Sequence, residues 1–382
     1  MFGSVEEARS RARKRLPAAV FHYIDGGKEA EQATVANEAA FARHTFLPAV
    51  CPTATAPKLG TDLFGRPSGM PLAIAPTGFV RIVHPDGELG AARAAASESV
   101  PIVLSTWSSV PLADAVAANP ETWFQLYMIG GREGARYCID MAREAGCRVL
   151  VVTADIAGVA PSDRVAPALP ETSGLAAALR FAPSALSRPG WLLALLKGGL
   201  AMPAPNAPRR FDGTMLRVQD AGRLLTRTPF GWDDLRWLRR QWQGPLVLKG
   251  IMRAADAERA VACGADGIVV SNHGGKVLDS TPGTLDVLPA IADAVAGRCE
   301  IMVDGGARRG ADIVKARALG AQGVLIGRPY LWGLACGGQQ GVERVLRLFR
   351  QSLSATLANL DLDDIARVGP DTLWAGAAQP PQ

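Results

Sequence analysis

Eight short apolar runs of strand length recur along this 382-residue chain, and longer segments with helical periodicity separate them. The runs are rich in Val, Ile and Leu and do not alternate with polar residues, which is typical of strands buried on both faces of a parallel sheet. They cover residues 71–76, 101–105, 122–127, 148–155, 245–250, 267–272, 300–305 and 323–328. This alternation predicts an α/β fold, a (β/α)8 TIM barrel, with a doubly wound open sheet as the alternative.

Three segments depart from this rhythm within what we expect to be a single domain, residues 1–382. Residues 1–70 precede the barrel and are expected to form a helical extension that caps its bottom or wraps one side. Residues 165–230 form a long insertion after the fourth strand, which we expect to be a lid or mobile loop. Residues 341–382 are expected to form a C-terminal helix, over 341–360, and a tail.

The insertion contains the apolar stretch "WLLALLKGGLAM", and residues 165–215 carry five basic against two acidic residues. The stretch is apolar enough for a weak contact with a membrane surface or a partner protein. The alternative is a helix packed over the mouth of the active site.

Composition excludes several other classes of protein. The net charge of +5 comes from scattered basic residues without a block of five, so we expect no nucleic-acid partner. There is no apolar leader at the N-terminus and no run of 18 apolar residues, so neither a signal peptide nor a spanning helix is expected. The six cysteines are scattered without a C-x-x-C pair, which predicts reduced thiols and a cytoplasmic location.

In a barrel of this kind the functional groups lie at the C-terminal ends of the strands. Nearly every predicted end carries a hydrogen-bonding or charged side chain, a density that a purely structural barrel does not need. These residues are Thr77, Ser105, Gln125 with Tyr127, Thr153 with Asp155, Lys249, Ser271 with His273, Asp304, and Arg328.

The last two ends predict a phosphate site. The motifs "DGGARRG" (304–310) and "IGRP" (326–329) combine glycines, which expose backbone N–H groups, with the cations Arg308, Arg309 and Arg328. Loops after strands seven and eight of such barrels frequently bind phosphate, which could belong to a substrate or to FMN.

Lys249 ends an otherwise apolar strand, where an unpaired ammonium is costly. It could form a Schiff base, or it could place a positive charge beside a delocalised anion such as a reduced flavin. The amide of Gln125 and the hydroxyls of Thr77, Ser105, Thr153 and Ser271 suit the donor and acceptor edge of an isoalloxazine ring.

His273 is the candidate base, because histidine titrates near neutral pH and this one lies at a strand end before two glycines. Asp155 could hold its other ring nitrogen. His, Cys and acidic residues show no spacing typical of metal ligands, so we expect no metal site.

At this point the motifs resemble a known family. "SNHGGKVLD", "DGGARRGADIVKARALGA", "IGRPYLWGLACGGQQGVERVL", "APTGFVRIVHPDGELGAARAA", "FQLYM", "LVLKGIM" and "LPAAVFHYIDGG" closely resemble, in order, segments of the FMN-dependent 2-hydroxy acid oxidases and dehydrogenases. The resemblance extends from about residue 8 to residue 360. It implies a (β/α)8 barrel, FMN as cofactor and a homotetramer.

The resemblance also implies roles for individual residues. His273 matches the active-site base, Asp155 its partner, Tyr127 a contact of the substrate hydroxyl, and Tyr23 a contact of the substrate carboxylate. Lys249 matches the lysine at flavin N1. The flavin-ring, ribityl and phosphate contacts match Pro76, Thr77, Gly78, Ser105, Gln125, Thr153, Ser271, Asp304, Gly305, Arg308, Gly327 and Arg328.

Two departures from the family concern the substrate. The family binds a substrate carboxylate with two arginines, and the matching positions here are Ser162, with Arg164 two residues further on, and Lys276. A lysine does not reproduce the bidentate fork of an arginine, so both changes together argue against a simple 2-hydroxy carboxylate.

Several segments, including "RARKRLP", "ANPETWFQLY" and "SRPGWL", resemble the pre-mycofactocin synthase branch, which oxidises an amine-bearing carbon in a peptide-derived core. We therefore expect oxidation of a C–H bearing OH or NH on a peptide-derived or bulky substrate. The proton leaves the heteroatom in a hydride-like transfer or the carbon in a carbanion-like one.

Three alternative functions remain. They are a conventional 2-hydroxy acid oxidase using Arg164 and Lys276, a non-catalytic flavoprotein scaffold, and a flavin-free phosphate-binding isomerase.

Overall fold

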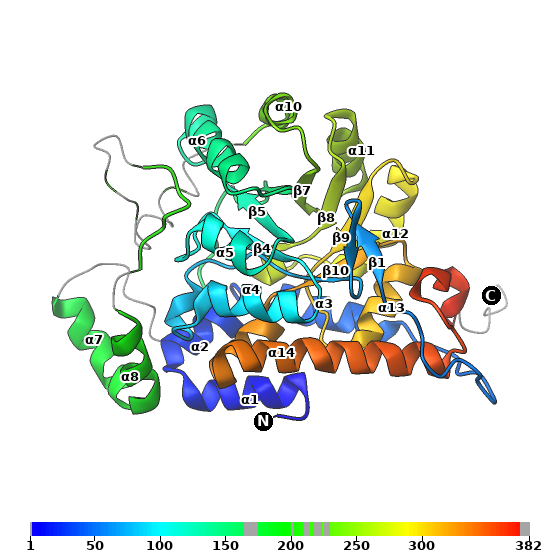
Figure 1. The fold of residues 1–382 in the computed structure, drawn as a ribbon, viewed down its shortest axis with the longest axis horizontal. Coiled ribbons are helices and arrows are strands. Elements are labelled where there is room, and N and C mark those ends of the chain that lie inside the picture. Colours follow the sequence, from blue (N-terminus) through cyan, green and yellow to red (C-terminus); the bar gives the residue numbers. More distant parts are fainter. Residues whose placement is uncertain are drawn as a thin grey trace.

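The computed structural model describes residues 2–163, 175–199, 202–209, 214, 216, 224 and 230–374, and its centre is a closed barrel of parallel strands (Figure 1). The order around the barrel is β10-β3-β4-β5-β6-β7-β8-β9. The strands are β3 (Leu72–Ile74), β4 (Ile102–Ser105), β5 (Thr122–Leu126), β6 (Leu150–Thr153), β7 (Leu246–Ile251), β8 (Gly267–Val270), β9 (Glu300–Val303) and β10 (Gly323–Ile326). All eight lie within the predicted runs or at most one residue beyond them, and closure excludes the open sheet.

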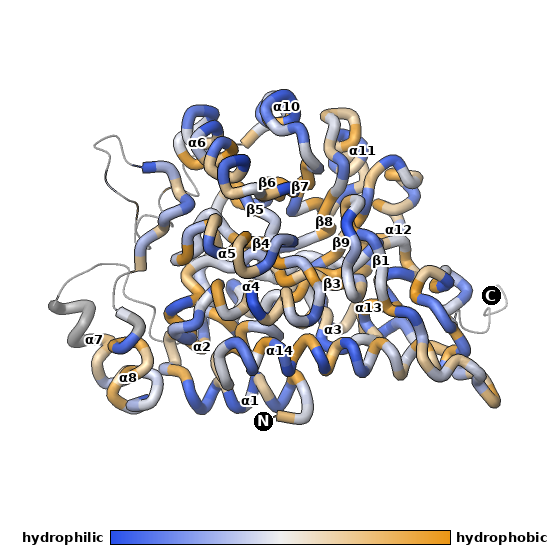
Figure 2. Tube along the Cα trace, viewed as in Figure 1, coloured by the Kyte–Doolittle hydropathy of each residue, from blue (hydrophilic) through white to orange (hydrophobic). Residues whose placement is uncertain are grey.

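A helix that packs on the outside of the barrel follows each strand. On α6 the buried residues Ala135, Cys138, Ile139 and Ala142 recur at helical spacing and face the barrel. Hydrophilic residues lie on outer helices such as α10 (Figure 2). The outer helices are α4 (Gly87–Ser97), α5 (Leu112–Ala118), α6 (Gly131–Glu144), α10 (Trp232–Gln241), α11 (Ala254–Ala262), α12 (Thr284–Val295), α13 (Gly310–Ala318) and α14 (Arg328–Asn359).

A hairpin closes the N-terminal end of the barrel, which the helical prediction for residues 1–70 did not anticipate. It consists of β1 (Thr61–Leu63) and β2 (Arg66–Ser68), and its turn residue Phe64 packs edge-on against Trp123 with ring centroids 5.2 Å apart. Gly267 makes room for this ring, because a Cβ there would lie 2.3 Å from Phe64 Cε1. The Phe64 N–H donates to the Glu300 carboxylate at 2.9 Å.

The remainder of the N-terminal segment is helical, with α1 (Val5–Arg15), α2 (Ala18–Asp25) and α3 (Gln32–Arg43). Helix α1 packs along α14 through the fully buried Ala8 and Ala12. The α14 helix begins at Arg328, before the expected residue 341, and bends where Gly337 and Gly338 leave helical geometry. Helices α2 and α3 continue to the opposite, C-terminal end of the barrel, where α3 contacts the segment after β8.

Part of the insertion after β6 is described. It contains α7 (Leu175–Leu186) and α8 (Pro189–Gly198), and Trp191 of α8 donates its indole N–H to the backbone oxygen of Ile82 at 2.8 Å. Residues 202–209 pack by Ala204 and Ala207 against Phe79 and Trp107, in the loops that follow β3 and β4. The predicted lid is otherwise described only at residues 187, 188, 199, 202–209, 214, 216, 224 and 230, and Arg164 lies outside the described residues.

Candidate active site

The C-terminal ends of the barrel strands bring the predicted residues to one mouth of the barrel. Their side chains contact one another across neighbouring strands. Ser105 Oγ donates to Gln125 Oε1 at 3.0 Å, and Tyr330 Oη donates to Thr77 Oγ1 at 2.7 Å. Gly78 is required where its loop passes Trp107, because a Cβ on Gly78 would lie 2.9 Å from the Trp107 Cβ.

Several buried polar atoms at this mouth lack a hydrogen-bond partner among the described residues. They include Gln125 Nε2, Thr153 Oγ1 and Asp304 Oδ1. An unpaired buried polar group costs about 1–3 kcal/mol, and such a cluster at one end of a barrel indicates a ligand that supplies the missing partners. An amide donor, a hydroxyl and a carboxylate oxygen suit a ligand with both donors and acceptors, so the residues present fit the ring and ribityl chain of FMN.

Lys249 carries a fixed positive charge at the centre of the mouth. Its ammonium lies 2.9 Å from Asp304 Oδ2 and donates to Ser271 Oγ at 2.7 Å, and the Lys249 and Asp304 side chains are 4% and 9% exposed. Burial opposes the charge, but the carboxylates of Asp304 and Asp155 outweigh it, so the pKa of Lys249 is raised. A protonated amine does not form a Schiff base, which favours the role of a charge beside an anion.

The structure brings His273 into contact with Asp155, the residue that the sequence predicted as its partner. His273 Nδ1 lies 2.9 Å from Asp155 Oδ1, which makes Nε2 the ring nitrogen available for proton transfer. Burial opposes ionisation of Asp155, but the adjacent His273, the bond to it and Lys249 lower the pKa of Asp155. Gly250, with a φ of +110°, allows this approach, because a Cβ there would lie 2.5 Å from Asp155 Cβ.

The backbone at His273 has an unusual left-handed conformation. His273 has a φ of +57°, and Gly274 and Gly275 follow with +64° and +73°. A non-glycine residue in this region is strained, and such strain is found where a functional side chain has to be aimed. The η2 turn (His273–Gly275) thereby directs the imidazole toward Asp155, and the two glycines complete a turn that other residues would resist.

Two tyrosines flank this pair. Tyr127 follows β5, and its N–H donates to Thr106 Oγ1 at 3.2 Å. Tyr23 belongs to α2, and its hydroxyl donates to the backbone oxygen of Gly78 at 2.8 Å. Burial raises the pKa of both phenols strongly, so both remain protonated hydrogen-bond donors.

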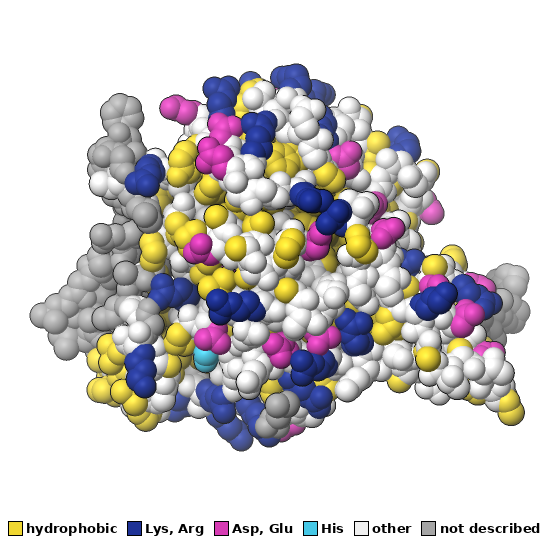
Figure 3. Space-filling view, viewed as in Figure 1, with side chains coloured by type: hydrophobic (Ala, Val, Ile, Leu, Met, Phe, Trp, Pro, Cys, Tyr) yellow, Lys and Arg dark blue, Asp and Glu magenta, His cyan; other side chains and the backbone are white. Residues whose placement is uncertain are grey.

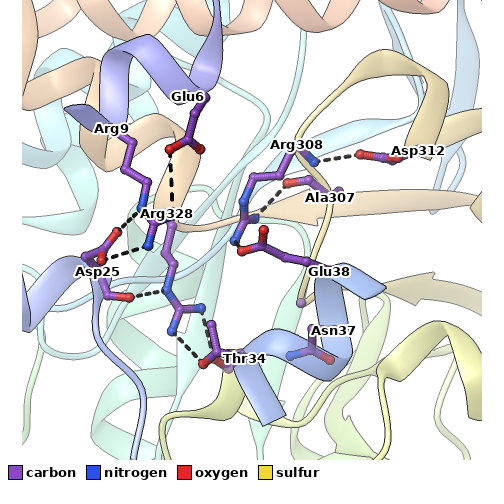
Figure 4. A network of polar contacts seen from close by, with 12 residues as sticks. Glu6, Arg9, Asp25, Thr34, Asn37, Glu38, Ala307, Arg308, Asp312 and Arg328 are labelled. Atoms are coloured by element: carbon purple, nitrogen blue, oxygen red, sulfur yellow. Dashed lines mark hydrogen bonds and ion pairs between the residues drawn. The ribbon is translucent and has the colours of Figure 1, made fainter. Parts of the chain in front are cut away.

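The predicted phosphate end lies where β9 and β10 finish. Gly305 has a φ of +79° and passes close to Asn37, so a side chain there would be both strained and crowded. The Arg308 guanidinium donates to Glu38 Oε1 at 2.7 Å (Figure 4). The guanidinium carbon lies 5.2 Å from the centre of the Trp332 ring. Gly327 precedes the first turn of α14, whose backbone N–H groups favour an anion.

The guanidinium of Arg328, like that of Arg308, is hydrogen-bonded to the protein. Nε donates to the backbone oxygen of Asp25 and Nη2 to that of Gly26, at 2.8 and 2.9 Å. Nη1 donates to the backbone oxygen of Gly274 at 2.8 Å, and Nη2 also approaches Thr34 Oγ1 at 3.4 Å. Figure 4 shows the side chain extending between Asp25 and Thr34. Burial lowers the pKa of Arg328 to about 10, so it stays charged at neutral pH.

Lys276 is also bonded to the protein. Its ammonium donates to the backbone oxygens of Tyr23 at 2.8 Å and Gly26 at 2.9 Å. Burial, with Arg328 nearby, lowers the pKa of Lys276 well below its ordinary value. In the neighbouring segment, Ser162 pairs with Glu29 in a parallel bridge, and its hydroxyl is buried without a partner among the described residues.

Sequence reasoning missed the side chains that join α3 to the loop after β8. Asn37 and Asn272 exchange hydrogen bonds through their amides at 2.9 and 3.0 Å. Asp279 accepts from the backbone N–H groups of Gln32 and Ala33 at 3.1 and 2.7 Å, and so caps the first turn of α3. These residues lie about 240 positions apart in sequence, and no local pattern marks such a pair.

Comparison with known proteins agrees with this geometry. The family model of FMN-dependent dehydrogenases matches residues 12–375. The chain is 41% identical to a pre-mycofactocin synthase of Mycobacterium tuberculosis over 97% of its length and 93% of the relative's. It is 38% identical to an L-lactate dehydrogenase of Chromohalobacter salexigens, covering 97% and 95% of the two chains. A crystal structure of the monotopic membrane protein (S)-mandelate dehydrogenase superposes with a TM-score of 0.86 at 34% identity, covering 98% and 99%.

Proposed function

Because the chain belongs to the FMN-dependent dehydrogenase family and is an FMN-dependent oxidoreductase, we propose that it oxidises a C–H group bearing OH or NH on a peptide-derived or bulky substrate. The observation that carries the proposal is the 2.9 Å contact between His273 Nδ1 and Asp155 Oδ1, beside the buried Lys249–Asp304 ion pair. It combines a proton acceptor with a fixed cation at one mouth of the barrel.

The protein's own groups have distinct tasks in this reaction. Bound FMN supplies a two-electron acceptor. His273 Nε2 takes the proton, from the heteroatom in a hydride-like transfer or from carbon in a carbanion-like one, and Asp155 holds the resulting imidazolium in place. The Tyr127 hydroxyl contacts the substrate's heteroatom, and Tyr23 lies over the same mouth. Lys249 stabilises negative charge that develops beside it.

We propose that the cofactor is held by residues of several strand ends. Gln125, Thr153 and Asp304, with their unpartnered atoms, contact the ring edge and ribityl chain. The further ring contacts are Pro76, Thr77, Gly78, Ser105 and Ser271. At the phosphate, Gly305, Gly327 and Arg308 take part, and Arg328 contributes its backbone N–H, because its guanidinium donates to backbone oxygens elsewhere.

The substrate proposal is supported by the two departures from the family pattern. Ser162 is a hydroxyl where the family has an arginine, and the Lys276 ammonium is bonded to α2. The 41% identity to a pre-mycofactocin synthase supports a peptide-derived amine as the substrate class. A conventional 2-hydroxy acid is the second candidate, favoured by the 38% identity to an L-lactate dehydrogenase.

The test is reduction of the enzyme's flavin in the absence of oxygen. The purified protein is expected to be yellow and to bleach with a cyclised Val–Tyr-derived peptide core, the compound that the pre-mycofactocin synthase branch oxidises. Lactate, glycolate and mandelate are expected to leave it oxidised. Rapid bleaching by any of these three acids would replace our substrate proposal with the second candidate. A colourless protein that takes up no FMN contradicts the proposed function altogether.

We also propose a weak contact with a membrane surface or partner through residues 165–215. Leu186, Leu193 and Leu196 of α7 and α8 are 68%, 59% and 52% exposed. Hydrophobic side chains gather on this part of the surface (Figure 3), and the (S)-mandelate dehydrogenase neighbour is a monotopic membrane protein. No described helix is long and apolar enough to cross a membrane, so the contact would be at the surface.

Co-sedimentation with vesicles that contain anionic lipid tests this contact. Replacing Leu193 and Leu196 together by Ser is expected to release the protein. The matched control is Leu278→Ser, which changes an equally exposed leucine elsewhere. Equal sedimentation of all three proteins contradicts the proposal.

The remaining proposals concern organisation and location. We propose one domain, residues 1–382, that assembles as a homotetramer in the cytoplasm and binds no nucleic acid. Light scattering of the purified protein gives the number of chains directly, and a mass other than four chains contradicts the tetramer.

A further inference from the structure

Lys276 lies three residues after His273 and three residues before the end of the "SNHGGKVLD" motif, yet its ammonium is directed to the end of α2. The last backbone oxygens of a helix have no partner within the helix. At α2 the oxygen of Tyr23 accepts from Lys276, that of Asp25 accepts from Arg328, and that of Gly26 accepts from both. Two cations therefore cap one helix end, where positive charge is favourable.

The same contacts join Tyr23 to the turn that carries His273. Arg328 binds the backbone oxygen of Gly274, and the N–H of Lys28 donates to the oxygen of Gly275 at 3.0 Å. The chain that follows α2 is thus attached to the η2 turn at consecutive residues. Lys276 belongs to this turn and bonds back to Tyr23, so the ammonium links the tyrosine on α2 to the loop of the base.

These contacts limit what Lys276 can offer to a substrate. An ammonium has three N–H donors, and backbone oxygens already accept two of them. The remaining donor can bind one acceptor oxygen, whereas a carboxylate is best held by the two parallel bonds of a guanidinium. Burial and the neighbouring Arg328 also disfavour the charge on Lys276.

The segment next to this loop offers a neutral hydroxyl. Residues 160–163 run beside the η2 loop and the start of α3, since the Ala160 N–H donates to the Val277 oxygen at 3.2 Å and the Glu29 N–H to the Pro161 oxygen at 2.8 Å. Within this segment the Ser162 hydroxyl is buried and unpartnered among the described residues. A hydroxyl can donate to a carbonyl or accept from an amide N–H, but it brings no charge.

We propose that Lys276 is a positioning residue, which caps α2 and fixes Tyr23 relative to the His273 turn, and that the substrate group on this side of the site is a neutral amide rather than a carboxylate. The proposal rests on the proposed function for its substrate part. Its positioning part concerns the protein alone and is independent of any bound ligand.

The positioning part is tested by hydrogen–deuterium exchange on Lys276→Met, with Lys28→Met as a matched control that removes a nearby charge. We expect Lys276→Met to speed exchange of the amides in residues 18–28 and 270–278 by about tenfold or more, which corresponds to ~1.4 kcal/mol of local stability. Lys28→Met is expected to leave both segments unchanged, and Lys276→Arg to restore protection at least in part. Unchanged exchange in Lys276→Met overturns the positioning role.

The substrate part is tested with a pair of ligands that differ in charge alone, (S)-mandelate and its amide, whose binding is followed by the flavin absorbance. We expect the wild type to bind the acid no more than about threefold more tightly than the amide, and Lys276→Met to leave this ratio unchanged. An acid preference above about tenfold that disappears in Lys276→Met shows that Lys276 recognises a carboxylate, and it overturns the proposal. If the acid preference disappears in Arg164→Met instead, Arg164 recognises the carboxylate. That result overturns the proposal of a neutral substrate group and leaves the positioning role of Lys276 intact.

The experiments distinguish failure of the positioning part or the substrate part from failure of the proposed function. If the protein takes up no FMN, the proposed function is wrong, and hydrogen exchange still decides whether Lys276 caps α2. If FMN is bound but neither ligand changes its absorbance, the substrate part is overturned, because an amide-accepting site should bind at least the amide.

Discussion

The strand ends of the barrel and the junction between α2 and the η2 turn both carry buried polar groups, but they satisfy them differently. At the strand ends, Gln125 Nε2, Thr153 Oγ1 and Asp304 Oδ1 have no partner among the described residues. At the junction, Arg328 and Lys276 donate to backbone oxygens at 2.8–2.9 Å. Unpaired polar atoms indicate where a ligand belongs, whereas paired cations indicate a structural joint.

The same contrast distinguishes two roles for a charged residue in a motif, contact with a ligand and contact with the protein itself. Lys249 and Lys276 both follow or lie near strand ends, and both are lysines that the family resemblance associates with ligands. Lys249 is paired with a carboxylate and has a raised pKa, while Lys276 contacts backbone oxygens and has a lowered pKa. The first is therefore suited to stabilise charge in the site, and the second to hold two segments together.

The largest effect is expected from Lys249→Met, which removes one partner of a buried ion pair. Asp304 would remain as an unpaired buried charge, and such a change costs about 3–5 kcal/mol of unfolding free energy. Urea unfolding of the FMN-free protein measures it. Adding Asp304→Asn to the same protein should restore part of the stability, because the unpaired charge is gone. If Lys249→Met is as stable as the wild type, the strand ends are not arranged around this pair.

His273→Asn is expected to lower the rate of flavin reduction by about 10²–10⁴-fold, because the base that takes the substrate proton is lost. FMN content should stay the same, since the proposed cofactor contacts are side chains other than His273. His44→Asn, at a remote half-buried site, is the matched control and should reduce its flavin normally. A rate for His273→Asn within about threefold of the wild type would assign the base to another residue.

Asp155→Asn tests the charge that supports His273. The pKa of Asp155 is lower in the folded protein than in the unfolded chain, where it is about 3.9. The ionised carboxylate therefore stabilises the fold above about pH 3.9. This stabilisation is lost as the pH falls through the lowered pKa of the folded protein. At pH 7 we expect a loss of about 1–3 kcal/mol. The difference between wild type and variant in thermal unfolding should shrink as the pH falls below about 4. A difference that does not depend on pH shows that Asp155 contributes by shape alone.

The barrel was predictable from sequence because each strand is an apolar run flanked by helical periodicity, and the strand ends then placed Lys249, His273 and Asp155 at one mouth. The hairpin of residues 61–68 was not, because three-residue strands with Pro67 in one of them lack any alternating pattern. Its position depends on Phe64 entering the barrel beside Gly267, a contact between residues about 200 positions apart.

The same limit applies to the candidate site. Residue types near strand ends indicated a flavin site, because apolar runs locate each strand and the polar residues at or just after its end. The orientation of Lys276 and Arg328 depends on where α2 packs, and no pattern within residues 18–25 indicates that its last oxygens face the loop after β8. Sequence therefore predicted which residues gather at the mouth but not which of them are already bonded to the protein.

The smallest effect is expected from Thr153→Val, and its sign distinguishes the two kinds of polar group most sharply. The substitution keeps the shape of the side chain and removes a hydroxyl that has no partner among the described residues, so the FMN-free protein should be equally stable or slightly more stable. The affinity for FMN should fall by about tenfold, which corresponds to the loss of one hydrogen bond of ~1.4 kcal/mol.

Thr122→Val is the matched control, because the Thr122 hydroxyl already donates to the backbone oxygens of Ala115 and Asn119 at 3.1 and 2.7 Å. That variant should lose about 1 kcal/mol of stability and keep its FMN affinity. If both substitutions destabilise the FMN-free protein equally, an unpartnered atom at a strand end does not indicate a ligand, and the contrast between the two regions fails.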